Sequence, residues 1–288
     1  MRKVMVYGTG TMGTGITQVM ATAGVEVLLG DALGGMDLPV KCKARVGSLL
    51  DRAVQKGKET VGNAKSIMDR IHPVADMADG ISQVDLFLEV AVEDMEVKQQ
   101  VFRKAGTQDL REETVFATNS SALSITELAS VTQRPDRFLG IHFFNPAPVM
   151  SLVEIVKGAA TDELVVGKVE AFIESLGKSP IVVNEAPGFV VNRILVPMIN
   201  EAVCALMEGV ASAEDIDKGM KLGANHPIGP LALADLIGLD VCLAVMETLH
   251  TEFGDPRYRP CPLLRKYVRA GFLGRKTKRG FFVYELIH

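Results

Sequence analysis

The chain has 288 residues, 48% of them hydrophobic and 23% charged, a composition ordinary for a soluble globular protein of one large or two average domains. Its net charge of −4 gives no reason to expect nucleic acid or an anionic membrane as a partner. No apolar run reaches the length of a membrane span, and strand character begins within the first few residues. Four scattered cysteines form no metal-binding pattern. We therefore expect a cytoplasmic protein with free thiols, no metal and no targeting segment.

The first stretch with a chemical signal is the predicted strand Lys3–Tyr7, which is followed by the GxGxxG loop Gly8–Gly13. A strand that runs into such a loop and then into a helical pattern is the order that a dinucleotide-binding turn requires. In that turn the first glycine makes a tight bend, the second lets the backbone approach a pyrophosphate, and the third lets the helix pack closely. We therefore predict cofactor contacts from Gly8, Gly10, Thr11, Met12 and Gly13.

An acidic residue follows the second predicted strand, Val25–Leu29. Asp31 lies 18 residues beyond Gly13, close to the spacing expected for the carboxylate that binds the adenosine ribose. Such a carboxylate accepts hydrogen bonds from the ribose hydroxyls and repels a 2′-phosphate, so we predict NAD as the cofactor and NADP as the less favoured alternative. The competing interpretation is that Asp31 only begins a turn.

Strand and helix patterns alternate through the first two thirds of the chain. Residues 32–70 are polar and helical, and we expect them to form a helix pair inserted after the second strand, with basic residues that either face solvent or attract a polyanionic substrate tail. Short apolar runs typical of buried parallel strands follow at 71–74, 84–89, 114–118, 137–142, 153–156 and 181–183. The alternation predicts an α/β fold with a Rossmann-like, doubly wound and mostly parallel sheet.

The pattern changes near residue 185. Beyond Pro187-Gly188 long helical patterns dominate, at 190–208, 212–222, 231–253 and 263–270. We therefore predict two domains, a dinucleotide-binding domain over residues 1–184 and an all-α domain over residues 185–288.

His142 stands at the end of a predicted strand, and Asn145-Pro146 forces a loop soon after it. Ligands of open α/β sheets bind at the carboxyl ends of the strands, which is the edge where His142 is expected. Glu154 lies within an apolar run, where an unpaired carboxylate would be costly to bury, and His142 is its natural partner. A carboxylate that fixes the imidazole raises its basicity, so we predict a catalytic His–Glu pair, against the alternative of a structural salt bridge.

Two further polar residues are candidates for the site. Ser121 also follows a strand end, and its hydroxyl could donate to an alcohol or carbonyl oxygen of a substrate, although capping of the next helix is the commoner role of such a serine. Asn192 lies on the first helix of the second domain, where an amide could reach the cleft between the domains, although by itself it would be an ordinary helix residue.

Seven segments in one order give the chain a resemblance to a known family. They are GTGTMG at 8–13, Glu93 with Lys98, NSSALSITELA at 119–129, IHFFNPAPVM at 141–150, APGFVVNR at 186–193, HPIGPLALADLIGLD at 226–240 and GRKTKRGFF at 274–282. On these motifs the chain resembles the short-chain 3-hydroxyacyl-CoA dehydrogenases, in particular the bacterial and archaeal 3-hydroxybutyryl-CoA dehydrogenases. The resemblance covers nearly the whole length.

The resemblance implies a reaction and a role for each candidate residue. His142 matches the general base, Glu154 the carboxylate that supports it, and Ser121 the serine that contacts the substrate 3-oxygen. Asn192 matches the asparagine that helps orient the acyl-CoA. Cofactor contacts are implied for Asp31, Glu93, Lys98, Asn119 and Ser121. The implied reaction is the NAD-dependent interconversion of an (S)-3-hydroxyacyl-CoA, such as 3-hydroxybutyryl-CoA, and the 3-ketoacyl-CoA, with His142 as base in one direction and acid in the other.

The resemblance also implies a homodimer that forms through the C-terminal domain, where an apolar surface is suggested by Ile194, Leu195, Met198 and Ile199. Two other functions are compatible with the same scaffold. One is a dehydrogenase of sugar acids such as L-gulonate, which shares the base and the glycine loop. The other is a non-catalytic dinucleotide-binding protein of the crystallin kind, which would have no need of several polar groups at one site.

Overall fold

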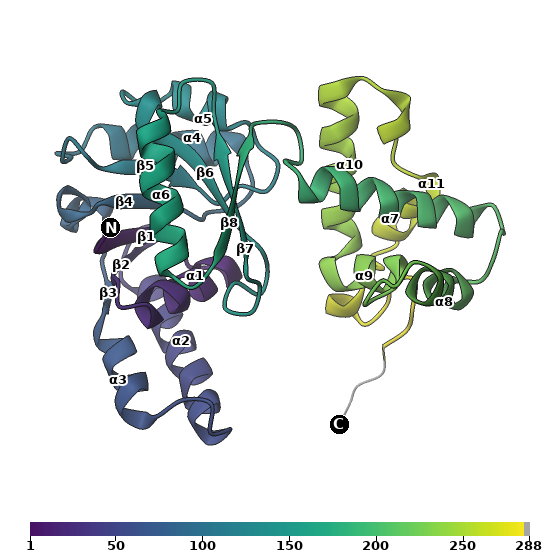
Figure 1. The fold of residues 1–288 in the computed structure, drawn as a ribbon, viewed down its shortest axis with the longest axis horizontal. Coiled ribbons are helices and arrows are strands. Elements are labelled where there is room, and N and C mark those ends of the chain that lie inside the picture. Colours follow the sequence, from purple (N-terminus) through teal and green to yellow (C-terminus); the bar gives the residue numbers. More distant parts are fainter. Residues whose placement is uncertain (285–288) are drawn as a thin grey trace. The chain divides into compact units, whose positions relative to one another are not determined.

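A computed structural model describes residues 1–284 and divides the chain into two compact units, Met1–Glu185 and the part from Ala186 onward (Figure 1). The division falls one residue later than we expected from the sequence. Glu185 belongs to the first unit because its backbone N–H donates to the carbonyl of Lys157 at 2.9 Å and its carboxylate accepts from the Ser124 hydroxyl at 2.6 Å.

One sheet of eight strands forms the centre of the first unit (Figure 1). Its strands are β1 Lys3–Tyr7, β2 Glu26–Gly30, β3 Ile71–Pro73, β4 Leu86–Glu89, β5 Val115–Thr118, β6 Phe138–Phe143, β7 Leu152–Lys157 and β8 Ser179–Asn184. They lie in the order β3-β2-β1-β4-β5-β6-β7-β8, and β6 and β7 are antiparallel while the other neighbours are parallel. The predicted doubly wound, mostly parallel sheet is confirmed.

Helices connect the strands of this unit. They are α1 Thr11–Thr22, α2 Asp37–Gln55, α3 Val61–Asp69, α4 Met95–Gly106, α5 Ile125–Ser130 and α6 Glu163–Ser175. The inserted pair that the sequence predicted after β2 is α2 and α3, which project away from the sheet in Figure 1. The side chains of β4, β5 and β6 are all buried, as expected for parallel strands covered on both faces.

The second unit is helical, as the sequence predicted. It contains α7 Val191–Met207, α8 Ala213–Gly223, α9 Pro230–Ile237, α10 Leu239–Phe253 and α11 Pro262–Arg269. The single helix expected over 231–253 is wrong, because Gly238 interrupts it with a φ of 110°, a backbone conformation that favours glycine and that turns the chain between α9 and α10.

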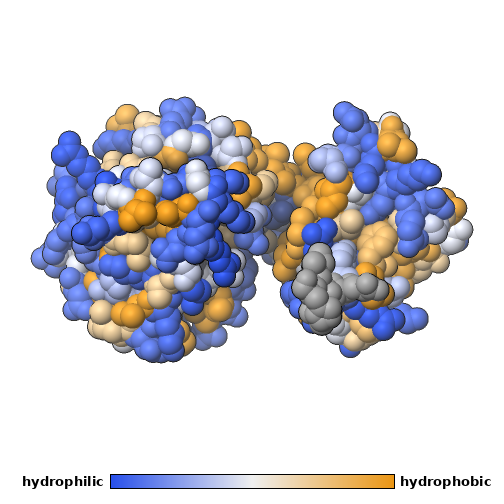
Figure 2. Space-filling model, turned by 90° about the horizontal axis from the view of Figure 1, so that it is seen from below, coloured by the Kyte–Doolittle hydropathy of each residue, from blue (hydrophilic) through white to orange (hydrophobic). Residues whose placement is uncertain are grey.

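The apolar surface expected on α7 is partly corrected by the structure. Ile194 is 67% exposed, but Ile199 is fully buried in the core of the helical unit, because α9 and α10 pack on that face of α7. Leu195 and Met198 are partly buried. Apolar residues nevertheless occur on the surface of this unit (Figure 2), and Leu222 is 76% exposed.

Candidate active site

The glycine loop between β1 and α1 has a shape that only glycine permits at two positions. Gly8 has a φ of 137°, and a Cβ there would lie 2.3 Å from the carbonyl oxygen of Val90. A Cβ on Gly13 would lie 1.9 Å from the carbonyl oxygen of Gly8. At Gly10, by contrast, a Cβ would meet nothing within 4 Å, so the middle of the loop presents open backbone.

The beginning of α1 has the features of an anion site. Gly10 occupies the N-cap position, where no side chain accepts from the first-turn N–H groups, and the first turn contains no acidic residue. The positive end of the helix dipole and the N–H groups of the first turn therefore face the open space at Gly10. A pyrophosphate bound over Gly10 fits this arrangement. Thr11 and Met12 lie in this first turn.

Asp31 follows β2 and is bonded to the same loop. Its Oδ2 accepts from the Thr9 backbone N–H at 2.9 Å and from the Thr9 hydroxyl at 2.5 Å, and its Oδ1 accepts from the Leu33 N–H at 3.1 Å. The carboxylate is thus fixed beside the glycine loop, as a ribose-binding acid requires, and it also holds the loop's own backbone. Burial, together with the charges of Asp76 and Asp31, raises the pKa of neighbouring Tyr7 to about 12.

Arg45 on α2 is a contact of the glycine loop that the sequence did not predict. Its guanidinium donates to the carbonyl of Thr9 and, at 3.3 Å, to the hydroxyl of Thr14. The only available signal was a basic residue on a polar helix, and most such residues are simply solvated.

A second residue that the sequence analysis missed is Glu89, the last residue of β4. It is fully buried, and its carboxylate accepts from the ammonium of Lys98 at 2.9 and 3.0 Å. The Thr118 hydroxyl donates to it at 2.7 Å and the Ala91 N–H at 2.5 Å. The available signal was an acidic residue at the end of an apolar strand.

The predicted residues Glu93, Asn119 and Ser121 lie at the same edge of the sheet. Glu93 Oε1 accepts from the Ser120 hydroxyl at 2.6 Å and from the backbone N–H groups of Ser121 and Ala122 at 2.7 and 3.2 Å. Its Oε2 lies 3.4 Å from the Lys98 ammonium. Glu93 therefore holds the turn that carries Ser121.

Asn119 links the ends of two neighbouring strands. Its side-chain oxygen accepts from the backbone N–H of Phe143 at 2.9 Å, and the contact is buried. Phe143 is the residue after His142, so Asn119 fixes the end of β6 relative to the turn after β5. This is a structural role beside the cofactor contact that the resemblance implied.

His142 and Glu154 are directly opposite each other on the antiparallel strands β6 and β7. The Nδ1 atom of His142 lies 2.7 Å from Oε2 of Glu154, and the two residues are 4% and 0% exposed. The Phe144 ring lies against the imidazole, with 4.5 Å between the ring centroids. A buried carboxylate held to one ring nitrogen fixes the tautomer and orientation of the imidazole, which is the arrangement that general acid–base catalysis needs.

The loop that follows His142 is held by Lys178. Its ammonium donates to the carbonyls of Ala147 at 2.7 Å and Met150 at 2.9 Å. Partial burial lowers the pKa of Lys178. Lys178 directly precedes β8, so it connects the loop after β6 to the start of that strand.

Asn192 belongs to the other unit, in the first turn of α7. The first unit by itself therefore brings together the glycine loop, Asp31, the Glu89–Lys98–Glu93 network, the turn at Ser121 and the His142–Glu154 pair.

Within residues 1–284 no helix is long and apolar enough to cross a membrane, and no three His, Cys, Asp or Glu side chains gather as metal ligands.

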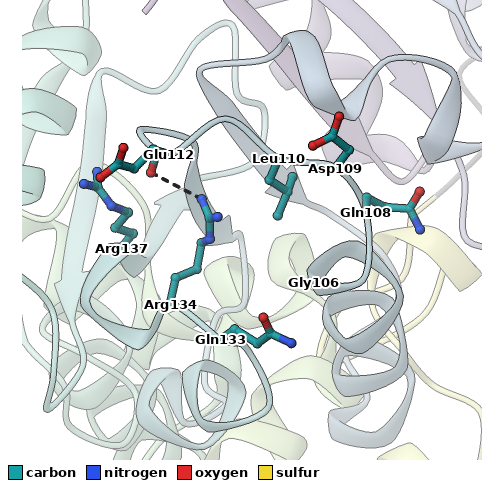
Figure 3. Close-up of a pocket in the computed structure, with 8 residues that line it drawn as sticks. All are labelled: Gly106, Gln108, Asp109, Leu110, Glu112, Gln133, Arg134 and Arg137. Atoms are coloured by element: carbon teal, nitrogen blue, oxygen red, sulfur yellow. Dashed lines mark hydrogen bonds between the residues drawn. The ribbon is translucent and has the colours of Figure 1, made fainter.

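A hollow of about 390 Å³ lies at the opposite, amino-terminal edge of the sheet, between the segments that precede β5 and β6 (Figure 3). The guanidinium of Arg134 crosses it and donates to the carbonyls of Arg111, Glu112 and Thr114 at 2.9, 3.4 and 3.3 Å. It also lies over the Phe116 ring. Because these contacts serve the backbone and the core, we assign this hollow no part in the chemistry.

Comparison with known proteins gives the same picture over the whole chain. The family model of the 3-hydroxyacyl-CoA dehydrogenase NAD binding domain matches residues 3–186, and that of the 3-hydroxyacyl-CoA dehydrogenase C-terminal domain matches residues 188–284. The chain belongs to the 3-hydroxyacyl-CoA dehydrogenase family. It is therefore an oxidoreductase with an NAD-binding domain, and the family, enzyme class and cofactor predicted from the sequence are confirmed.

Individual members of the family are similar along the full length. A 3-hydroxybutyryl-CoA dehydrogenase of Clostridioides difficile is 50% identical over 284 residues, which cover 98% of this chain and 99% of that protein. The crystal structure of the (S)-3-hydroxybutyryl-CoA dehydrogenase of Ralstonia eutropha matches with a TM-score of 0.94 and 50% identity over 99% of each chain. The mitochondrial hydroxyacyl-coenzyme A dehydrogenase of Homo sapiens is 38% identical over 293 residues, which cover 99% of this chain and 91% of that protein.

Proposed function

We propose that the chain interconverts (S)-3-hydroxybutyryl-CoA and acetoacetyl-CoA, with NAD as the cofactor. The observation that carries the proposal is the buried His142–Glu154 pair, with 2.7 Å between Nδ1 and Oε2, at the sheet edge that also bears the glycine loop. Relatives that carry the name of this reaction are half identical to the chain over nearly its full length, which supports the same substrate.

In this proposal His142 holds and moves the proton. Because Glu154 holds Nδ1, Nε2 is the nitrogen that takes the proton of the substrate 3-hydroxyl, and the Glu154 carboxylate stabilises the imidazolium that results. In the reverse direction the imidazolium returns the proton to the ketone oxygen. General acid–base help of this kind is typically worth roughly 10²–10⁴-fold. When bound, NAD would supply the acceptor for the hydride on the substrate carbon that bears the hydroxyl group.

The other candidate residues bind and orient. Ser121 donates its hydroxyl to the substrate 3-oxygen, and Asn192 orients the acyl-CoA; both roles rest on the family resemblance. Asp31 binds the adenosine ribose, and the open backbone of Gly10 with the first turn of α1 binds the pyrophosphate. Further cofactor contacts come from Glu93, Lys98 and Asn119.

We propose further that the helical unit binds substrate and joins two copies of the chain into a cytoplasmic homodimer. The apolar residues exposed on that unit, such as Ile194 at 67% and Leu222 at 76%, support this. A mass measured by light scattering tests it. The mass of two chains supports the dimer, and the mass of one chain at working concentration contradicts it.

The reaction is tested by the oxidation of NADH when acetoacetyl-CoA is added to the purified chain, with acetoacetyl-CoA analogues of longer acyl chain and with NADPH as parallel assays. Rapid oxidation that depends on acetoacetyl-CoA supports the proposal. Oxidation of L-gulonate by NAD with no turnover of acetoacetyl-CoA would indicate the sugar-acid enzyme instead. Binding of NADH without turnover of either substrate would indicate a non-catalytic protein.

A further inference from the structure

Glu89 is a buried carboxylate surrounded by donors. Its two oxygens accept from the Lys98 ammonium, the Thr118 hydroxyl and the Ala91 N–H, at distances between 2.5 and 3.0 Å. Every one of these partners donates, so the site is complementary to the ionised carboxylate and not to the protonated acid. The ammonium of Lys98 supplies the opposite charge that a fully buried carboxylate requires.

Lys98 extends this anchor to a second carboxylate. The Lys98 side chain is 1% exposed, and its ammonium lies 3.4 Å from Oε2 of Glu93, whose side chain is 43% exposed. An exposed carboxylate with a mobile partner would be ordered only weakly, because surface ion pairs contribute little. Here the partner is held in place by two hydrogen bonds to Glu89. The Oε2 end of Glu93 therefore faces an ammonium that Glu89 holds in place.

Glu93 in turn orders the turn after β5. Its other oxygen accepts from the N–H groups of Ser121 and Ala122 and from the Ser120 hydroxyl. We propose that Glu89 is a positioning residue of the active site, because it fixes Lys98, through Lys98 it fixes Glu93, and through Glu93 it fixes the backbone that presents Ser121. This inference rests on the role proposed above for Ser121. Glu89 is buried beneath these groups and acts only through them.

The chain offers a matched pair of variants for the test. Thr118 and Thr114 are both fully buried and lie at opposite ends of the same stretch of chain. The Thr118 hydroxyl donates to Glu89 at 2.7 Å, and the Thr114 hydroxyl donates to the carbonyl of Val84 at 2.9 Å. Thr118→Val removes a donor to Glu89 and also the acceptor of the Ser120 N–H at 3.2 Å, whereas Thr114→Val removes one contact at the other edge of the sheet. Glu89→Gln removes the charge of the anchor while it keeps its size.

Steady-state kinetics with acetoacetyl-CoA and NADH, together with thermal unfolding midpoints, distinguish a positioning role of Glu89 from a role in fold stability alone. Since small misplacements of a reacting group are costly, we expect Glu89→Gln to lower kcat roughly tenfold or more and Thr118→Val to lower it several-fold. Thr114→Val should also lower the midpoint, because it loses a buried hydrogen bond, and should leave kcat near the wild-type value. Equal kcat values in the two threonine variants would overturn the inference.

The route through Ser121 has its own test. If Glu89 acts by placing Ser121, Glu89→Gln should lower kcat much less in a Ser121→Ala background than in the wild-type background, because coupled residues are not additive. If Glu89→Gln lowers kcat by the same factor in both backgrounds, this route is overturned. A raised KM for NADH with an unchanged kcat in Glu89→Gln would overturn it as well. A wild-type chain that fails to turn over acetoacetyl-CoA would refute the proposed function itself, an outcome that is distinct from these.

Discussion

The two units use buried carboxylates in different ways. In the first unit Glu89 and Glu154, both fully buried, each bind a basic side chain, Lys98 and His142, at or near a strand end. In the helical unit the buried carboxylates accept almost entirely from backbone N–H groups. Asp217 accepts from the first turn of α9 at 2.8 and 2.9 Å, and Asp235 accepts from two N–H groups near the end of the described chain, both at 2.9 Å.

Burial of an acid therefore does not by itself mark a catalytic site. A buried carboxylate bonded mainly to backbone N–H groups, as in Asp217 and Asp235, satisfies donors that would otherwise be unpaired, so its contribution is to stability. A carboxylate bonded to an imidazole or an ammonium controls the orientation and protonation of a group that can react. The chemical nature of the partner thus separates the buried carboxylates of the active site from the structural ones, and the following variants test that separation.

The largest effect is expected for His142→Gln. The amide cannot take a proton from the 3-hydroxyl, so kcat should fall by roughly 10²–10⁴-fold, the usual contribution of a general base. The variant should still fold and bind NADH, because the residues at the glycine loop are untouched. Turnover of acetoacetyl-CoA and fluorescence titration with NADH measure the two quantities, and near-normal turnover would remove His142 from the role of base.

A smaller effect, on stability alone, is expected for Asp235→Asn. The Asn amide cannot accept at both oxygen positions, so at least one of the N–H groups of Phe281 and Phe282 loses its partner, at a cost of about 1–3 kcal/mol. The unfolding midpoint should fall. The matched control is Asp240→Asn, which breaks an exposed ion pair with Lys276 and should change the midpoint little. Equal midpoints in the two variants would contradict the structural role of Asp235.

The smallest effect is expected for Asp31→Ala. Loss of the carboxylate removes a partner of the ribose hydroxyls and the repulsion of a 2′-phosphate, so the preference for NADH over NADPH should narrow by roughly tenfold, or about 1.4 kcal/mol. Asp31 also holds the Thr9 backbone and hydroxyl, so Thr9→Val is the control that disturbs the loop and keeps the charge. The ratio of kcat/KM for the two cofactors is measured, and an unchanged ratio in Asp31→Ala would count against the prediction.

Much of the fold could be predicted because its signals are local. The glycine loop, the short apolar strands and the helical patterns beyond residue 185 each occupy a contiguous stretch. The His142–Glu154 contact could also be predicted, since a carboxylate within an apolar run requires a partner and a histidine at a strand end is near in sequence. The helix break at Gly238 could not, because an isolated glycine is tolerated within a helical pattern.

The rest of the site depends on contacts between distant segments. Glu89 is identified as an anchor only when Thr118 and Lys98, from a neighbouring strand and a following helix, are seen to converge on it. Arg45 reaches the glycine loop across 36 residues of sequence, and no local pattern distinguishes it from a solvated arginine. Such partners are set by the tertiary packing, which a single sequence does not display.

The most direct test of the distinction between the two kinds of buried carboxylate is the kcat of Glu154→Gln, measured beside Asp235→Asn under conditions in which both variants are folded. In serine proteases, replacing the buried carboxylate that holds a histidine by its Nδ1 lowers kcat by about 10⁴-fold with the geometry intact. We predict a fall of at least roughly 10²-fold in Glu154→Gln and a kcat close to the wild-type value in Asp235→Asn. A kcat in Glu154→Gln as close to the wild-type value as that of Asp235→Asn would contradict the assignment of the His142–Glu154 pair.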